Sequence, residues 1–229
     1  MIENKKKFYH GLTMLVVFTV LLIVMFSPVF DGKNALQYSD ELYNSISKDS
    51  AYYIQDIIED SEEFIGTQIA VKIQMENEEQ ANQTALLYKA TGAEVTVSGA
   101  ELDIAGDLGN ILSVALNDAD ILYNENTELL ENTYGYESQR VVYNWHTSLE
   151  KMDDKLLDQD LVDESKVVLK AMEKGIEPSY NYFGIQPESM SSKIWVVIGS
   201  LAFYLFYTVL YGFGLMYLLE GFGLKMGAH

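Results

Sequence analysis

An uncharged run of 26 residues, Ile194 to Leu219, constrains this chain more than any other stretch. At a rise of about 1.5 Å per residue, a helix of that length exceeds the ~30 Å hydrocarbon core of a bilayer. We therefore predict a transmembrane helix over residues 193–219. A second uncharged run of 23 residues, Phe8 to Phe30, predicts another transmembrane helix over residues 8–30. The chain between the two spans is thereby attached to the bilayer at both ends.

The first uncharged run also has features of a cleavable signal peptide, since lysines precede an apolar segment. Two observations favour an uncleaved signal anchor instead. The run is longer than the apolar core of a typical signal peptide, and the following SPVFDGKN has no small residues at the spacing of a cleavage site. Pro28 lies at the predicted outer end of the span, where it can end the helix.

The charges around the first span predict how the chain crosses the membrane. Three lysines, Lys5, Lys6 and Lys7, precede this span together with the single acidic residue Glu3. Because cytoplasmic flanks are enriched in lysine and arginine, we predict that residues 1–7 are cytoplasmic. It follows that residues 31–192 form an extracytoplasmic domain and that residues 220–229 form a cytoplasmic tail. The expected location is a cell membrane, either a plasma membrane or an inner membrane.

The predicted extracytoplasmic domain is strongly acidic. Residues 31–192 contain 32 acidic and 10 basic side chains, a formal net charge of −22. Such a domain repels phosphate backbones and anionic headgroups, which argues against nucleic-acid binding. Cations or basic protein surfaces fit its charge, although acidity also serves solubility alone. The chain has no cysteine, so packing rather than disulfide bonds must hold the domain together.

Apolar periodicity predicts a small mixed unit between residues 67 and 117. Ile69, Val71 and Ile73 alternate with polar or small residues, as in a strand buried on one face. A helix with an acidic first turn follows, and two further alternating segments predict a β-hairpin over residues 94–105. Asp107 is the expected N-cap of the next helix. The order strand, helix, hairpin, helix predicts an α+β fold with a three-stranded sheet.

Helices are expected on both sides of this mixed unit. Residues 34–63 have the apolar spacing of one or two helices. Apolar residues from Val142 to Leu156 repeat at intervals of three and four, and a further helix is expected to end near Pro178. These two later helices are predicted to form an antiparallel hairpin. The complete expectation is two transmembrane helices flanking an extracytoplasmic domain with a small sheet and a helical hairpin.

Residues of the types used in catalysis or metal binding are sparse. His146 is the only histidine between the spans, so no Ser-His-Asp triad is indicated. His146, Glu150 and either Asp153 or Asp154 share one predicted helical face at a spacing that suits a cation, but a solvated helix face is the simpler explanation. The acidic residues from 153 to 164 allow the same two interpretations. We predict neither an enzyme nor a bound cofactor or metal.

The second span has a polar stripe along one side. Steps of 4, 3, 1 and 3 residues align hydroxyl-bearing side chains, with small residues close by. A single helix in lipid gains nothing from them, whereas a packed helix gains hydrogen bonds and close backbone approach. Anchoring at the membrane interface explains Trp195 and Tyr217 near the ends but not the central tyrosines. The predicted helix–helix interaction residues are Ser200, Tyr204, Tyr207, Thr208, Tyr211 and Gly212.

These features favour a non-catalytic integral membrane protein that acts as a scaffold or accessory subunit of a membrane protein assembly. The expected partners are the membrane and either other membrane or extracytoplasmic proteins or a second copy of the chain. The alternative is an extracytoplasmic ligand- or cation-sensing module that signals through a partner. Two spans that enclose an external domain are also the layout of many receptors.

Overall fold

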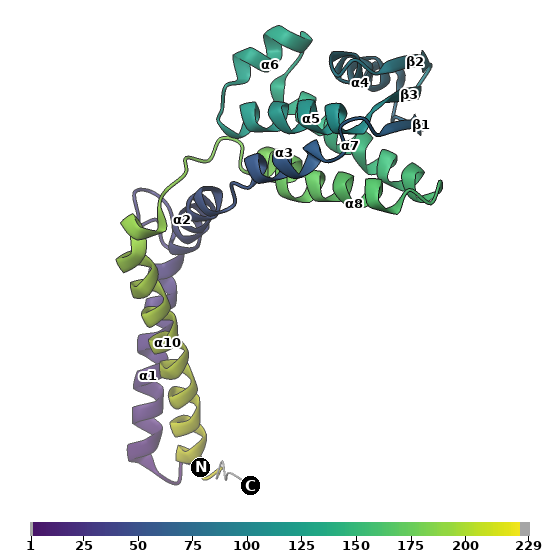
Figure 1. Cartoon of the computed structure of the whole chain (residues 1–229). Helices are drawn as coiled ribbons and strands as arrows, with labels where there is room; N and C mark the ends of the chain where they lie inside the picture. The colour runs from purple at the N-terminus through teal and green to yellow at the C-terminus, as the bar shows by residue number, and fades with distance from the viewer. Residues whose placement is uncertain (1, 225–229) are drawn as a thin grey trace. The chain divides into compact units, whose positions relative to one another are not determined.

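The computed structural model describes residues 2–224, which are mostly helical with one small antiparallel sheet (Figure 1). The described residues form two units. The first contains the residues up to Ser47 and those from Pro187 onward, and the second contains residues 48–186. The second unit is shorter than the predicted domain of residues 31–192. The predicted cytoplasmic tail of residues 220–229 lies largely outside the described residues.

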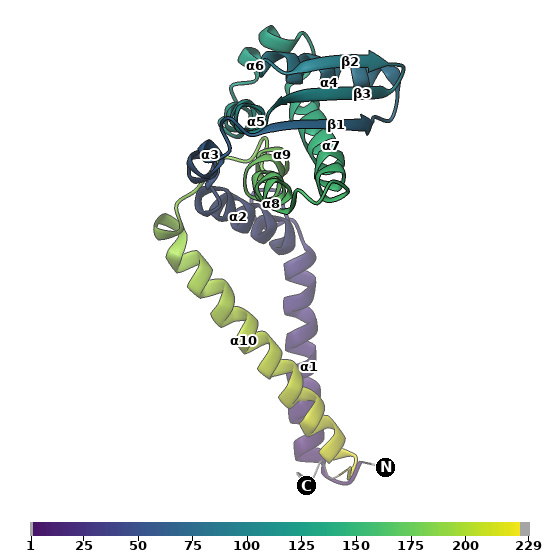
Figure 2. The same ribbon diagram turned by 45° about the vertical axis from the view of Figure 1, so that its right-hand side comes forward.

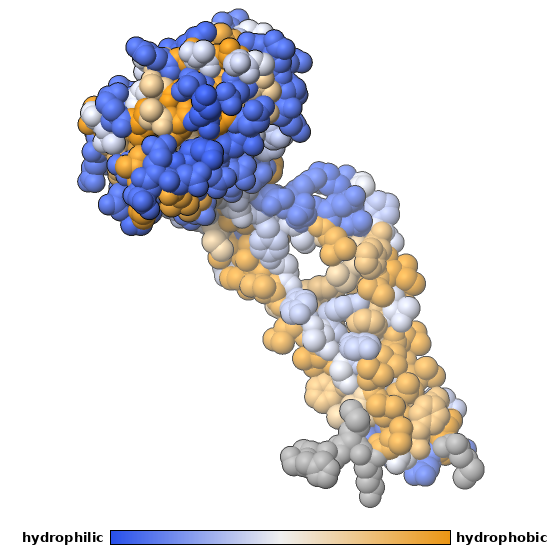
Figure 3. Space-filling model, turned by 90° about the vertical axis from the view of Figure 1, so that its right-hand side faces the viewer, coloured by the Kyte–Doolittle hydropathy of each residue, from blue (hydrophilic) through white to orange (hydrophobic). Residues whose placement is uncertain are grey.

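The first unit consists of three helices: α1 (Lys5–Phe26), α2 (Ala35–Ser50), which ends just beyond the unit boundary, and α10 (Met190–Gly221). By length and composition, α1 and α10 are each able to cross a membrane. Most of their residues are not buried, and Figure 3 shows the hydrophobic surface over this helical part of the molecule. The structure therefore supports membrane association, as the two uncharged runs predict.

The ends of α1 and α10 differ slightly from the predicted spans. Helix α1 begins after Asn4, whose side chain accepts a hydrogen bond from the backbone N–H of Lys7 at 3.1 Å. It ends two residues before Pro28, as expected for a residue that cannot continue a helix. Helix α10 starts three residues before the predicted span, and Ser189 precedes it in extended conformation.

The second unit contains the predicted three-stranded sheet. Its strands are β1 (Gln68–Gln74), β2 (Glu94–Ser98) and β3 (Glu101–Asp107), paired antiparallel in the order β1-β3-β2 (Figure 2). The register places Val71 opposite Ile104, and both are buried. Because alternate side chains point to the same face, this pairing creates one apolar face and leaves the other polar. The predicted strand and hairpin are confirmed.

The remaining elements of the second unit are helical: α3 (Ile54–Glu62), α4 (Glu78–Ala90), α5 (Leu108–Tyr123), α6 (Thr127–Tyr134), α7 (Ser138–Leu157), α8 (Val162–Ala171), the π-helical turn η1 (Met172–Ile176) and α9 (Glu177–Asn181). Helices α4 and α7 pack on the apolar face of the sheet, and α8 packs on α7. Asp107 caps α5 as predicted, accepting a hydrogen bond from the Asn110 N–H at 3.0 Å. The dominance of helix makes α+β only a loose description.

Two features of this unit differ from the sequence prediction. Helix α6 was not expected, and it is held in place because buried Leu130 and Tyr134 join the core. The last helical segment continues past Pro178 to Asn181 instead of ending at the proline. Pro178 occupies the first turn of α9, directly after the π-helical turn, where a missing backbone N–H is tolerated.

Candidate functional site

Helices α1 and α10 are in backbone contact at glycines. A Cβ atom at Gly11 would lie 2.7 Å from the carbonyl oxygen of Gly214 and closer still to the backbone nitrogen of Leu218. A Cβ atom at Gly221 would lie 2.6 Å from the Cα atom of Phe8. These separations are too short for any side chain, so the absence of a Cβ permits backbone contact between the helices.

Polar contacts hold the ends of the same helix pair together. The Lys7 ammonium lies 2.7 Å from the Glu220 carboxylate. The backbone N–H groups of Glu3 and Asn4 both donate to the carbonyl oxygen of Gly221, at 2.9 and 3.1 Å. This carbonyl belongs to the last turn of α10, where a helix has no internal donor to offer. The first residues of the chain therefore cap the last turn of α10.

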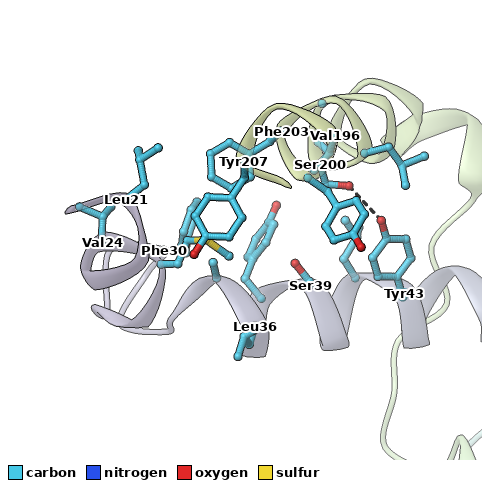
Figure 4. A pocket seen from close by; sticks show the side chains of 17 residues that line it. Leu21, Val24, Phe30, Leu36, Ser39, Tyr43, Val196, Ser200, Phe203 and Tyr207 are labelled. Carbon is cyan, nitrogen blue, oxygen red and sulfur yellow. Dashed lines mark hydrogen bonds between the residues drawn. The ribbon is translucent and has the colours of Figure 1, made fainter. Parts of the chain in front are cut away.

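An apolar cavity of about 620 Å³ opens between α1, α2 and α10. This volume falls within the range of roughly 300–1,000 Å³ that is usual for small-molecule sites. Figure 4 shows Leu21 on the α1 side, Leu36 on α2, and Val196 and Phe203 on α10. Phe30 lies in the segment between α1 and α2 and completes the wall. Its ring stacks on the ring of Tyr38, which belongs to α2. The cavity thus has walls from both apolar helices and from the amphipathic helix α2.

Hydroxyl groups interrupt the apolar wall at a few points. The Tyr43 and Ser200 hydroxyls lie 2.9 Å apart and join α2 to α10 (Figure 4). The Ser39 hydroxyl also lines the cavity. Tyr207 is different, because its hydroxyl oxygen is buried and has no hydrogen-bond partner among residues 2–224. A buried hydroxyl without a partner is unfavourable, and the burial of the Tyr207 hydroxyl also keeps it out of reach of molecules in the cavity.

The predicted polar stripe faces several environments. Ser200 contacts Tyr43 of α2, whereas Tyr207 and Tyr211 contact Phe18 of α1, with ring centroids 4.4 and 5.0 Å apart. These three stripe residues therefore contact other helices of the same chain. Their partners, Tyr43 and Phe18, were not identified from the sequence, because neither shares a motif with the stripe.

Among the described residues, Tyr204 and Thr208 form no side-chain hydrogen bond or ring contact with α1. The Thr208 hydroxyl donates to the Tyr204 carbonyl of its own helix at 2.8 Å, and the Tyr204 side chain is 68% exposed. No atom outside its own stretch of helix lies within 4 Å of a Cβ placed at Gly212. The close contact is made instead by Gly214 and Gly221. Their separation of seven residues, two helical turns, is the sequence signal that places both on one face.

A second cluster lies in the core of residues 48–186, around the buried carboxylate of Asp118. One of its oxygens accepts hydrogen bonds from the Tyr134 hydroxyl at 2.6 Å and from the Trp145 indole N–H at 2.8 Å. Burial raises the pKa of Asp118 to about 6, although the two hydrogen bonds act in the opposite direction. The Trp145 ring packs on Tyr88 with centroids 5.1 Å apart. Asp118 therefore joins α5, α6 and α7.

We expect the stability of this unit to decrease as pH rises from about 4 to 7 in a manner that depends on Asp118. The folded state keeps the proton up to about pH 6, whereas the unfolded chain releases it near 3.8. The protonated folded state is thus favoured at low pH, and the advantage, about 3 kcal/mol, is lost as pH passes through 6. Urea unfolding of the wild type and Asp118→Asn in detergent, at successive pH values, measures the difference.

A direct readout of this titration uses Trp145 as the probe. In a Trp195→Phe background Trp145 is the remaining tryptophan of the chain. Its emission is expected to change with a midpoint near pH 6, because its indole donates to the titrating carboxylate. The Asp118→Asn variant should show no such transition. Parallel pH profiles of unfolding in both proteins would contradict the assignment.

A buried polar network also links α4 to α7. The Gln80 amide donates to Asn144 at 3.2 Å, and Asn144 in turn donates to Gln83 at 3.3 Å. The Arg140 guanidinium donates to the same Gln83 oxygen at 3.4 Å. Buried amides that satisfy one another specify one relative position of two helices. We therefore assign this network a structural role.

The histidine and acidic side chains considered as cation ligands are paired with other side chains of the protein. His146 lies 3.1 Å from Glu177 of α9, and Asp153 accepts a hydrogen bond from Ser165 of α8. Asp158 and Asp163 form exposed ion pairs with nearby lysines. Within residues 2–224, no three histidine, aspartate or glutamate side chains gather closely enough to hold a metal ion.

The cavity between α1, α2 and α10 is therefore the candidate binding site of the first unit, and the Asp118 cluster contains a buried carboxylate of the second. The first assignment rests on the residues that line the cavity, and the second rests on the hydrogen bonds and burial of Asp118. Comparison of the chain with protein-family models, with curated proteins and with solved structures finds no match.

Proposed function

We propose that the protein is a non-catalytic subunit of a membrane protein assembly. In this proposal α1 and α10 cross a cell membrane, and the acidic unit of residues 48–186 lies outside the cytoplasm. The lysines at the start of α1 support this orientation, because basic residues favour the cytoplasmic side. The negative charge of the external unit suits a partner with a basic surface.

The observation that carries this proposal is the exposed polar and aromatic face of α10. Tyr204, near the middle of the helix, is 68% exposed, and its hydroxyl has no hydrogen-bond partner among the described residues. Leu205 and Phe206 beside it are also more than half exposed. In hydrocarbon a phenol hydroxyl lacks the water that would otherwise accept its hydrogen bond. A helix of another subunit that presents an acceptor to Tyr204 would remove this cost.

The arrangement of α1 leaves this face of α10 open to an additional partner. Helix α1 occupies the side of α10 that carries Gly214 and Gly221. The Tyr204 hydroxyl is left without an intramolecular partner even though the two helices are paired. The expected partner is thus a transmembrane helix, either from another membrane protein or from a second copy of the chain.

The test compares two hydroxyl deletions on the same helix. We expect the full-length protein, extracted in mild detergent, to be recovered in an assembly larger than the 25.9 kDa chain. Tyr204→Phe should reduce the assembled fraction about fivefold, since it removes one intermolecular hydrogen bond. Thr208→Val should leave the fraction unchanged, because the Thr208 hydroxyl is already bonded within its own helix. Native mass spectrometry measures the assembled fraction.

Two results would count against the proposal. One is recovery of the wild type as a single chain in both mild detergent and lipid nanodiscs. The other is an equal effect of Tyr204→Phe and Thr208→Val, which would show that the exposed hydroxyl contributes nothing specific.

A further inference from the structure

The two edges of the three-stranded sheet differ in how they are protected. On β1 the outer edge is covered, because the Gln159 side-chain amide donates to the carbonyl oxygen of Ala70 at 3.0 Å and α7 packs on this strand. Lys72 adds a charge to the same strand, which discourages pairing with a further strand. Strand β2 forms the opposite edge, and its main neighbours are β3 and α4 (Figure 2). It contains neither proline nor lysine.

The register of the sheet shows which backbone groups of β2 face outward. The Met75 N–H donates to the Ala100 carbonyl oxygen at 2.8 Å, so the even-numbered residues of β3 that follow direct their backbone groups toward β1. The residues of β2 opposite them are Val95 and Val97, whose backbone groups therefore point away from β3. Their two N–H and two C=O groups have no backbone partner among residues 2–224. This edge is half of an antiparallel ladder.

A hollow of about 740 Å³ lies beside this edge, on the side of the sheet that carries α4. Val97 of β2, Leu86 of α4 and Tyr136 belong to its lining, and the Leu86 side chain is 44% exposed. The Val95 and Val97 side chains point to this face, where they pack against the core. A strand paired with β2 would place every second side chain on the same face, over the hollow. Small apolar side chains suit these positions.

Carboxylates surround the same edge. Glu78 and Glu79 of α4 line the hollow together with one basic residue, Lys89. On the other face of the sheet, the Glu94 side chain of β2 is exposed. A strand paired with β2 would place its remaining side chains beside Glu94, where opposite charges stabilise a cross-strand pair and like charges destabilise it. Lysine or arginine is therefore the side chain that fits this second face.

We infer that the free edge of β2 binds an extended segment of a partner protein as an additional antiparallel strand. Its basic side chains lie on the Glu94 face, and its small apolar side chains lie over Leu86 and Val97. Backbone hydrogen bonds to β2 supply affinity, and the alternating side chains supply specificity. A second copy of this chain fits poorly, because it would bring Glu94 close to another acidic edge. The inference deepens the proposed function, on which it rests for the presence of a protein partner.

The experiment titrates the full-length protein in a non-ionic detergent with a labelled heptapeptide of alternating lysine and valine. Two further versions carry N-methyl groups, one on the valines and one on the lysines. In an antiparallel pair, the peptide residues that bond to β2 share a face with Val95 and Val97, so the valine amides face β2 and the lysine amides face away. Methylated valines should weaken binding at least tenfold, and methylated lysines should change it by about twofold at most. Fluorescence anisotropy measures the Kd.

Variants of the protein test the same edge from the other side. Glu94→Lys should weaken binding about fivefold, because it turns a cross-strand attraction into a repulsion. Glu62→Lys makes the same change of charge at an exposed position of α3, which packs on α5 and α8, and should have no effect. Val97→Pro removes an outward N–H while the ladder to β3 stays intact, and should weaken binding at least tenfold. Hydrogen exchange of residues 94–98 should slow when the unmodified peptide binds.

Several outcomes would overturn the inference. These are the absence of binding at about 1 mM unmodified peptide, equal binding of the two methylated peptides, and equal effects of Glu94→Lys and Glu62→Lys. Protection from exchange only outside residues 94–98 would place the peptide elsewhere. A dimer of the free protein that Val97→Pro disrupts would show that a second copy occupies the edge. Tyr204→Phe should bind the peptide as the wild type does, so failure of this inference is distinguishable from failure of assembly through α10.

Discussion

Trp145→Ala is expected to lower the free energy of unfolding of residues 48–186 by about 5 kcal/mol. The Trp145 side chain is fully buried and packs on Tyr88, so its removal leaves a large cavity in the core. Truncation of a buried tryptophan alone costs about 3–5 kcal/mol. The variant also removes the indole N–H that donates to Asp118, leaving this carboxylate with the Tyr134 hydroxyl as its remaining donor.

A loss of this size approaches the whole stability of a typical domain, about 5–15 kcal/mol. Hydrogen exchange of α5 and α7 in the detergent-solubilised protein is the appropriate measurement, because it follows this unit separately from α1 and α10. Trp195→Ala is the natural control, since Trp195 is 80% exposed and belongs to α10. Trp145→Phe should have a smaller effect: it also loses the hydrogen bond, but it keeps an aromatic ring in the core. Unchanged exchange in Trp145→Ala would show that the cluster around Asp118 is not a core element.

Gly11→Val is expected to reduce the population of closely paired α1 and α10 at least tenfold. The added Cβ would lie 2.7 Å from the Gly214 carbonyl oxygen and near the backbone of Leu218. Rotation of a side chain offers no relief, because the obstructing atoms belong to the backbone of the facing helix. The two helices must therefore move apart, which removes their dispersion contacts along the glycine face.

The absence of cysteine makes this separation simple to measure. Spin labels attached to cysteines introduced at Leu12 and Phe213, both exposed, report the distance between the helices. A single short distance is expected in the wild-type background, and a longer, broader distribution is expected in Gly11→Val. Gly212→Val is the control, because an added Cβ at Gly212 meets open space. Identical distributions in the two valine variants would contradict the backbone contact.

Much of the fold follows from local sequence patterns. Runs of uncharged residues are long enough to predict α1 and α10, because helix length and bilayer thickness are both fixed by geometry. Alternation of apolar residues predicts β1 and the hairpin, because side chains of a strand point to opposite faces in turn. Asp107 is recognisable as an N-cap because its role depends on backbone groups three residues away. Helix α6 escaped prediction because its two core residues make a short and weak pattern.

The candidate site is less visible in the sequence. The stripe on α10 drew attention to Ser200 and Tyr207, but its pattern does not distinguish contact with α1 from exposure. Tyr204 and Thr208 belong to the same stripe, yet one is exposed and the other bonds within its own helix. Periodicity gives the direction of a side chain and contains no information about what lies opposite.

Local sequence patterns are sufficient to predict the two apolar helices, the acidic character of the chain between them, the strands and the cap of α5, since each depends on residues that are neighbours along the chain. The contact of Gly11 with Gly214, the burial of Asp118 beside Trp145 and the cavity next to Tyr207 become visible only once the chain is folded. These features join segments up to about 200 residues apart. Their existence depends on packing between distant elements, which local propensity does not encode.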